Sequence, residues 1–332
     1  MTMRRTRGIR LLALAAVVAL GATACSGGGK EKTDDTSTSG GGNAAGSSGY
    51  TVAFITHETP GDTFWDKIKA GAQQAAKDTG VTLKYSADPD ATKQAVLIQN
   101  AVDSKVNGIA TTLVTPAALA GAVKAATDAK IPVVALNSGI DQYKQLGALM
   151  YFGSDESVAG EAGGERIATA GGKHPLCVIQ AAGSVALEAR CAGVKKSVPG
   201  TENVQVNGAD DSAVTSTLQA KLTQDKSIDW IVTLGAQQAQ DAMKAVEAAG
   251  SQAKIATFDL NQDVAQAVQD GKIQFSIDQQ PYVQGYMAVT SLYLYLKNGN
   301  DIGGGKAVLT GPSFVDSNNI ATILPYTKNN TR

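Results

Sequence analysis

The sequence predicts an α/β protein with two doubly wound parallel-sheet domains. Short β-branched runs alternate with longer alanine-rich stretches of helical periodicity, and this alternation is interrupted once, near residues 151–155. Repetition of strand, helix and strand implies right-handed crossovers and parallel sheets that helices cover on both faces. One sheet of nine or more strands is the alternative, but the interruption favours two smaller domains.

Each expected strand is a short apolar run. In order, the strands cover residues 51–56, 82–86, 108–114, 131–137, 176–180, 203–208, 230–235, 254–259 and 272–277. Stretches with helical spacing lie between them, such as 64–77, 93–106 and 236–249, and a helix over 157–170 opens the second series. Gly80, Gly250 and Gly271 each follow a periodic run, where glycine commonly ends a helix.

The N-terminus has the pattern of a secretory signal. Four arginines precede an apolar run at 11–20, which is too short to span a bilayer because about 20 apolar residues are needed. Small residues at 21–24 lead to Cys25 and resemble a bacterial lipobox, although Ala22 stands where that pattern favours Leu. We expect a signal peptide at 1–24 and lipidation of Cys25. Ordinary secretion with cleavage nearby is the alternative.

The segment after the cysteine is rich in Gly, Ser, Thr and Asn and has no apolar periodicity. Such a segment buries too little surface to offset its ordering entropy, so we expect a flexible tether over 25–49. The protein is then extracytoplasmic and anchored to the cell membrane by its N-terminal lipid. Residues 50–332 suffice for about two domains.

Charge and cysteine content narrow the possible partners. The chain has 29 Lys+Arg and 30 Asp+Glu, and without the four signal arginines 25 basic residues face 30 acidic ones. Nucleic-acid binding is therefore not expected, because it needs a basic face. Cys177 and Cys191 form an even pair in an oxidising compartment, which fits either a disulfide or two buried thiols.

No catalytic pattern emerges from the sequence. His57 and His174 are the only histidines, and the chain lacks the phosphate-loop, dinucleotide, zinc-protease and nucleophile-elbow motifs. We therefore expect no enzyme, no cofactor and no metal.

Polar and aromatic residues instead follow the first strand. Phe64 and Trp65 open the next helix and suit stacking on a sugar ring, and Asp62 suits hydrogen bonds from hydroxyl groups. The plainer interpretation is that Asp62 caps the helix and one aromatic belongs to the core.

Several motifs in this order resemble the type I periplasmic binding proteins, and more narrowly the ribose- and galactose-binding branch of sugar ABC importers. They are the aromatic pair, Asp90-x3-Gln94-x3-Ile98-x2-Ala101, Gly-Ile at 108–109, Ile-Pro-Val-Val at 131–134 and Thr-Phe-Asp at 257–259. The resemblance implies two Rossmann-like domains joined by three hinge crossovers, with the ligand trapped by closure. We expect lobes at 50–153 plus 280–304 and at 154–279 plus 305–332.

The resemblance also implies a ligand site, with departures from the family pattern. Asn137 and Ser138 replace an Asp-Arg pair, Glu188 replaces a ligand-binding arginine, and Gly235 and Ala236 replace Asn-Asp. The implied ligand-binding residues are Asp62, Phe64, Trp65, Asn137, Glu188, Arg190, Asp259 and Gln279.

These departures bear on the ligand. Loss of arginines and convergence of Asp62, Glu188 and Asp259 predict an acidic cleft, which disfavours an anion and suits a neutral sugar, a polyol or an amine-bearing ligand. Arg190 is expected to pair with one of the carboxylates. Plainer roles stay open for three residues: Glu188 at a helix N-terminus, Asp259 as a cap and Asn137 in a turn.

We therefore expect a monomeric, lipid-anchored solute-binding protein that delivers a neutral sugar or polyol to the permease subunits of an ABC importer. A ligand-presenting receptor for a sensor kinase is the first alternative, and a secreted carbohydrate hydrolase is the second.

Overall fold

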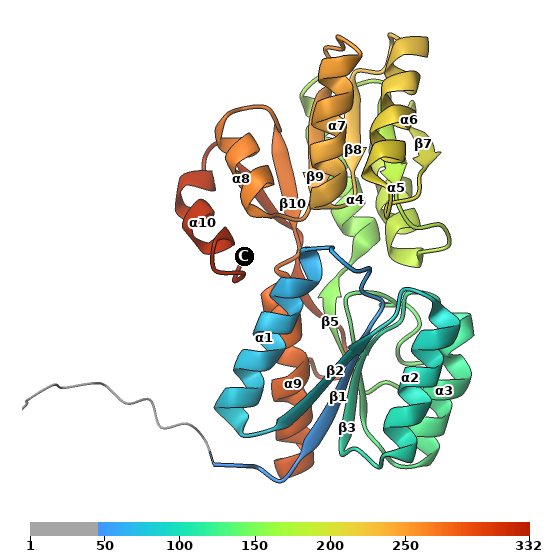
Figure 1. The fold of residues 1–332 in the computed structure, drawn as a ribbon, viewed down its shortest axis with the longest axis vertical. Coiled ribbons are helices and arrows are strands. Elements are labelled where there is room, and N and C mark those ends of the chain that lie inside the picture. Colours follow the sequence, from blue (N-terminus) through green and yellow to red (C-terminus); the bar gives the residue numbers. More distant parts are fainter. Residues whose placement is uncertain (1–45) are drawn as a thin grey trace, which may run out of the picture. The chain divides into compact units, whose positions relative to one another are not determined.

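A six-stranded sheet with helices on both faces forms the centre of each of two lobes (Figure 1). This computed structural model describes residues 46–332. The predicted signal peptide at 1–24, Cys25 and most of the predicted tether lie outside the described residues. The predicted α/β class with two doubly wound, mainly parallel sheets is confirmed.

The first lobe has strand order β11-β5-β4-β3-β1-β2, and neighbouring strands in it pair in parallel. The strands are β1 (Thr51–Thr56), β2 (Thr82–Ala87), β3 (Gly108–Thr112), β4 (Val133–Leu136), β5 (Met150–Ser154) and β11 (Val308–Gly311). Helices α1 (Phe64–Thr79) and α9 (Pro281–Asn298) cover one face, and α2 (Ala91–Asp103) and α3 (Pro116–Asp128) cover the other (Figure 1). Apolar side chains fill both interfaces.

Helices α1 and α9 pack backbone to backbone. A Cβ atom at Gly71 would lie 2.0 Å from the Tyr282 carbonyl oxygen, and one at Gly285 would lie 2.0 Å from the Ile68 carbonyl oxygen. Any side chain at either position would separate the helices. This packing fixes the first turns of both helices, which carry Phe64 and the segment after Gln280.

The second lobe has strand order β12-β10-β9-β8-β6-β7, with β12 antiparallel to β10. The strands are β6 (Pro175–Ile179), β7 (Glu202–Gln205), β8 (Trp230–Thr233), β9 (Lys254–Phe258), β10 (Phe275–Asp278) and β12 (Ser313–Asp316). The helices are α4 (Glu156–Thr169), α5 (Val185–Ser197), α6 (Asp211–Gln224), α7 (Ala236–Ala248), α8 (Gln262–Gln269) and α10 (Ile320–Thr327). Helices α4 and α5 pack together on one face, and α6 packs on α7 on the other.

A disulfide joins Cys177 on β6 to Cys191 on α5, with the Cα atoms 5.8 Å apart. Both residues are fully buried in the core that α4 and α5 share with the sheet. Of the two alternatives that the sequence left open, a disulfide or two buried thiols, the structure contains the disulfide. The bond ties α5, which carries Arg190, to the central part of its sheet.

The chain passes between the two sheets three times, as the family resemblance implied. The passages follow β5, follow β10, and join β11 to β12. The predicted boundary at 304/305 is wrong, because β11 pairs with β5 of the first sheet and the chain reaches the second sheet only at Ser313. Strands β5, β11 and β12 were not among the predicted strands; β11 and β12 lie at sheet edges and are only partly buried, so neither forms a continuous apolar run. Within residues 46–332, no helix combines the length and the hydropathy needed to cross a membrane.

Candidate functional site

A cavity of about 890 Å³ is lined by residues from both lobes. Most of its lining follows the carboxyl ends of strands, which is where open α/β sheets bind ligands. Residues at these ends include His57 after β1, Asn137 after β4, Gln180 after β6, Gly235 after β8, Asp259 after β9 and Gln279 after β10.

The first lobe contributes an aromatic group to the cavity. Phe64 is half-buried and packs edge to face against Trp65, with the ring centroids 5.1 Å apart. Trp65 is only 4% exposed and also packs edge-on against His57, at 4.7 Å. Both predicted aromatics line the cavity, but Phe64 presents more surface to it and Trp65 supports Phe64 from the core.

Asp62 and His57 flank these rings. The Asp62 Oδ1 atom accepts a hydrogen bond of 3.0 Å from the Phe64 backbone N–H, so this residue holds the start of α1 while also lining the cavity. Burial lowers the pKa of His57 to about 3, and its Nδ1 atom lies 2.8 Å from the Thr112 hydroxyl. At neutral pH, His57 therefore adds a neutral imidazole to the site.

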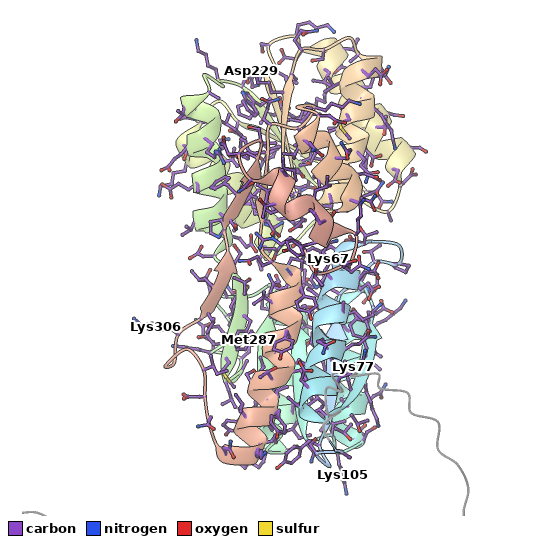
Figure 2. The ribbon with its side chains drawn as sticks, turned by 90° about the vertical axis from the view of Figure 1, so that its left-hand side faces the viewer. Lys67, Lys77, Lys105, Asp229, Met287 and Lys306 are labelled. Carbon is purple, nitrogen blue, oxygen red and sulfur yellow. A yellow bond between two sulfur atoms is a disulfide. The ribbon has the colours of Figure 1, made fainter. Side chains whose placement is uncertain are left out.

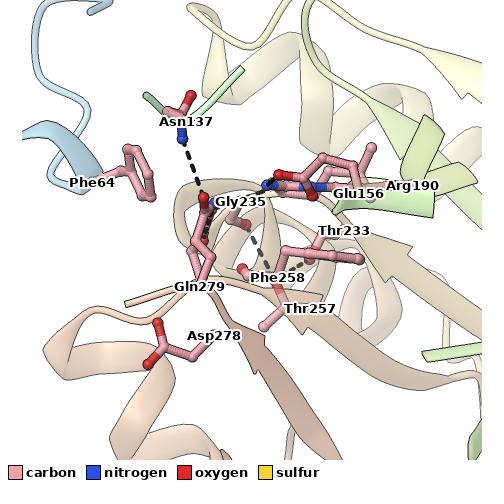
Figure 3. Close-up of polar contacts among 12 residues, drawn as sticks. Phe64, Asn137, Glu156, Arg190, Thr233, Gly235, Thr257, Phe258, Asp278 and Gln279 are labelled. Atoms are coloured by element: carbon pink, nitrogen blue, oxygen red, sulfur yellow. Dashed lines mark hydrogen bonds and ion pairs between the residues drawn. The ribbon is translucent and has the colours of Figure 1, made fainter. Parts of the chain in front are cut away.

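A chain of hydrogen bonds crosses the floor of the site (Figure 3). The Asn137 amide donates to Gln279 Oε1 at 3.1 Å, and Gln279 Nε2 donates to Asp259 Oδ1 at 2.8 Å. Asn137 and Asp259 both adopt left-handed backbone conformations, with φ of 65° and 66°. Non-glycine residues rarely adopt this conformation, which turns both side chains at the strand ends. The structure thus brings together three of the predicted ligand-binding residues.

Arg190 is buried beneath this chain and makes several contacts. Its Nε and Nη2 atoms donate to the two Glu156 oxygens at 2.6 and 3.1 Å, and its Nη1 atom donates to the Leu234 carbonyl at 3.0 Å. The Nη1 atom also lies 3.9 Å from Asp259 Oδ2. Arg190 thus pairs with carboxylates as expected, but its main partner is Glu156, which sequence reasoning missed. Burial raises the pKa of Asp259 to about 7.

Glu188 does not belong to the site. It is exposed and lies outside the cavity lining, whereas Leu187 and Arg190 on the same helix are buried and line the cavity. Residues three apart share one face of a helix, and the residue between them at position 188 points elsewhere. The predicted convergence of three carboxylates is therefore wrong.

The second lobe contributes amide side chains that the sequence analysis did not select. They are Gln180, Gln205, Asn207, Gln237 and Gln238. Among the described residues, the buried Gln180 Oε1 atom has no hydrogen-bond partner. Gln180 is the last residue of the predicted strand at 176–180 and Asn207 the last but one of the predicted strand at 203–208, so their position along the chain was a usable signal. Gln237 and Gln238 lie on α7, where no such signal marked them.

Gly235 makes room for two of these amides. A Cβ atom at this position would lie 2.7 Å from Gln238 Oε1 and 3.1 Å from Gln180 Nε2. Gly235 also lines the cavity. The absence of a side chain there therefore allows the two glutamines to approach each other at the wall.

The charged residues of the cavity lining determine which ligands the site can bind. The acidic residues are Asp62, Asp211 and Asp259, and among the described lining residues there is no lysine and one arginine, Arg190. Glu156 already holds that arginine. Residues 46–332 contain no cluster of three side chains suited to a metal. The site can bind hydroxyl groups through amides and carboxylates.

The sequence matches the periplasmic binding protein domain family over residues 52–301. A xylose/arabinose-binding protein of Sulfolobus acidocaldarius is 26% identical, covering 83% of this chain and 73% of its own. A ribose import binding protein of Haemophilus influenzae is 28% identical, covering 76% of this chain and 87% of its own.

A solved structure shows a higher identity. It is a carbohydrate transporter from Acidothermus cellulolyticus 11B in complex with myo-inositol, 57% identical to this chain with a TM-score of 0.84. The match covers 85% of this chain and 99% of the other.

Proposed function

Because this chain belongs to the periplasmic binding protein family, we propose that it captures an uncharged cyclic polyol or sugar between its lobes, with myo-inositol as the first candidate. The family is extracytoplasmic and consists of binding proteins, so an enzymatic role as a secreted hydrolase is set aside. The choice of myo-inositol rests on the 57% identical protein, whose structure contains that ligand.

The observation that carries this proposal is the balance of charges and amides in the cavity. The one arginine of the described lining is bonded to both oxygens of Glu156, which leaves no cation free for a phosphate or carboxylate. An anion would instead meet uncompensated acidic side chains. Amides can both donate and accept, which suits hydroxyl groups because these also do both.

The residues of the cavity make different contacts with the ligand in this proposal. The exposed part of Phe64 offers an aromatic face to the C–H groups of a ring, and Asp259 accepts hydrogen bonds from hydroxyl groups. Asn137 belongs to the first lobe and bonds to Gln279, which in turn bonds to Asp259 and holds it in place. A ligand that contacts both lobes at once stabilises the closed arrangement, which is how such proteins couple binding to closure.

Membrane attachment and delivery to an ABC importer are part of the same proposal. A lipid on Cys25 would keep the monomer near permease subunits, and the intervening glycine- and serine-rich segment would separate the anchor from the cavity. Cys25→Ser should release the protein from the membrane fraction without changing ligand affinity. Retention of that variant in membranes would count against lipidation.

A thermal-shift screen tests the ligand class. The panel contains myo-inositol, neutral pentoses and hexoses, an inositol monophosphate and an amino sugar. Binding raises the melting temperature in proportion to RT ln(1+[L]/Kd), so myo-inositol or a neutral sugar should give the largest shift and the phosphate none. A larger shift with the phosphate would overturn the proposed class. Calorimetric titration of the best ligand then gives the affinity.

A further inference from the structure

Arg332 contacts two of the three crossovers between the lobes. Its Nε atom forms an ion pair of 2.6 Å with Asp278 Oδ2 at the end of β10, and its Nη1 atom donates to Gln280 Oε1 at 3.0 Å in the passage that follows. Its Nη2 atom donates to the hydroxyl of Ser313 at 3.3 Å, where the passage from β11 reaches β12. One guanidinium group therefore joins segments more than thirty residues apart in the chain.

Asp278 depends on this contact. Its side chain is fully buried, and its Oδ1 atom accepts from the Gln280 backbone N–H at 2.9 Å. The charge of Lys67, a buried residue on α1 (Figure 2), also acts on Asp278, but the Lys67 Nζ atom donates to the Thr63 carbonyl at 3.2 Å. Burial raises the pKa of Asp278, and Arg332 opposes that effect. Without Arg332 the carboxylate would be a buried charge without an ion-pair partner.

The segment held by this pair has an uncommon backbone. Gln280 is left-handed, with φ of 55° and ψ of 62°, and lies immediately before α9. Such a conformation in a non-glycine residue persists only when its surroundings impose it. Here the Gln280 side chain donates to the Thr310 carbonyl at 2.7 Å, and its backbone donates to Asp278.

The strained turn determines where Gln279 lies. The Gln279 carbonyl accepts from the Thr310 hydroxyl at 2.7 Å, and its side chain links Asn137 to Asp259 at the floor of the cavity (Figure 3). A change in the Asp278–Gln280 turn would therefore move a residue of the ligand site, although Arg332 itself does not line the cavity.

We propose that Arg332 is a positioning residue that clamps the second and third crossovers together and thereby holds Gln279 in the ligand site. The contacts of Arg332 that form this clamp do not depend on which ligand the protein binds. Only the expected effect on affinity rests on the function proposed above.

The test compares the wild type with Arg332→Gln, Asp278→Asn and the double variant in the full chain. Arg332→Gln removes the ion pair, and Asp278→Asn removes the buried charge while keeping an acceptor for the Gln280 N–H. Arg166→Gln is the matched control, because Arg166 pairs with Asp316 on the second lobe at 2.5 Å and contacts neither crossover. Calorimetry with myo-inositol gives affinity, and hydrogen exchange of the ligand-free protein gives local opening around Gln280.

We expect Arg332→Gln to weaken myo-inositol binding about tenfold and to speed exchange at Gln280 by a similar factor, and the added Asp278→Asn to restore much of both. The control should change neither. Unchanged exchange in Arg332→Gln would overturn the clamp. Faster exchange with unchanged affinity would overturn the positioning role. If the wild type fails to bind myo-inositol, that ligand is wrong, while exchange at Gln280 still decides the clamp.

Discussion

The Gln279 amide nitrogen donates to the Asp259 carboxylate at 2.8 Å, while the Gln279 oxygen accepts from Asn137 at 3.1 Å. Gln279 thus donates a hydrogen bond to a residue of the second lobe and accepts one from a residue of the first lobe. The second Asp259 oxygen lies 3.9 Å from Arg190, too far for a hydrogen bond. We therefore expect this oxygen to accept a hydrogen bond from a ligand hydroxyl.

Asp259→Ala should therefore weaken myo-inositol binding by at least about tenfold, because hydroxyl donors desolvated on closure would lose their acceptor. Titration calorimetry measures the effect. Glu188→Ala is the matched control, since this carboxylate is exposed and outside the cavity, and it should bind like the wild type. Equal affinity in both variants would place the site elsewhere.

Asp259 also predicts a dependence of stability on pH. Burial raises the pKa of this group from 3.8 to about 7, so the folded state holds a proton that the unfolded state releases between these values. The contribution of Asp259 to the free energy of unfolding is therefore complete below about pH 4 and is lost as the pH rises to about 7. Urea denaturation of the ligand-free protein at several pH values measures this slope. Asp259→Asn should flatten it, and an unchanged slope would refute the assignment.

The two aromatics should respond differently to truncation. Phe64→Ala should weaken ligand binding by about 1–1.5 kcal/mol with a small effect on stability, because the ring is only half-buried. Trp65→Ala should lower the free energy of unfolding by about 3–5 kcal/mol, because Trp65 is 4% exposed in the core. Denaturation and calorimetry on both variants separate the effects. A stable Trp65→Ala protein with lost affinity would reverse these roles.

Gly235→Ala should reduce affinity for myo-inositol by about tenfold, because the new methyl group must displace Gln238 or Gln180 from the wall. Gly121→Ala on α3 is the control, since a Cβ atom there meets nothing within 4 Å. The control should bind normally and be slightly more stable. Binding by Gly235→Ala at wild-type strength would show that these glutamines do not shape the ligand site.

Loss of the disulfide should act on stability alone. Cys177 and Cys191 are 14 residues apart, and closing a loop of that length is worth about 3 kcal/mol. The double Cys→Ala variant should melt at a lower temperature yet keep its affinity at 25 °C. Alkylation of both thiols without prior reduction would show that the bond is absent in the protein.

Local patterns in the chain sufficed to predict the α/β class, the two-domain division and most of the strands. Burial on both faces leaves a continuous apolar run in the chain, as in Val52–Ile55, and helical burial leaves a period of 3.6 residues. Both signals are local, so they can be read without knowing which segments meet. The resemblance to the family pointed to Asn137, Asp259 and Gln279, and each of them lies at or just after the carboxyl end of a predicted strand, where parallel sheets bind ligands.

The remaining features of the site depend on how distant segments pack together. The face of α5 that meets the cavity excludes Glu188 and includes Arg190, and that choice depends on how the helix packs on its sheet. The assignment of β11 to the first sheet, the approach of Gln180 to Gln238 and the pairing of Arg332 with Asp278 all join distant segments. Such contacts leave no periodic trace in the sequence, because they join segments that are far apart along the chain.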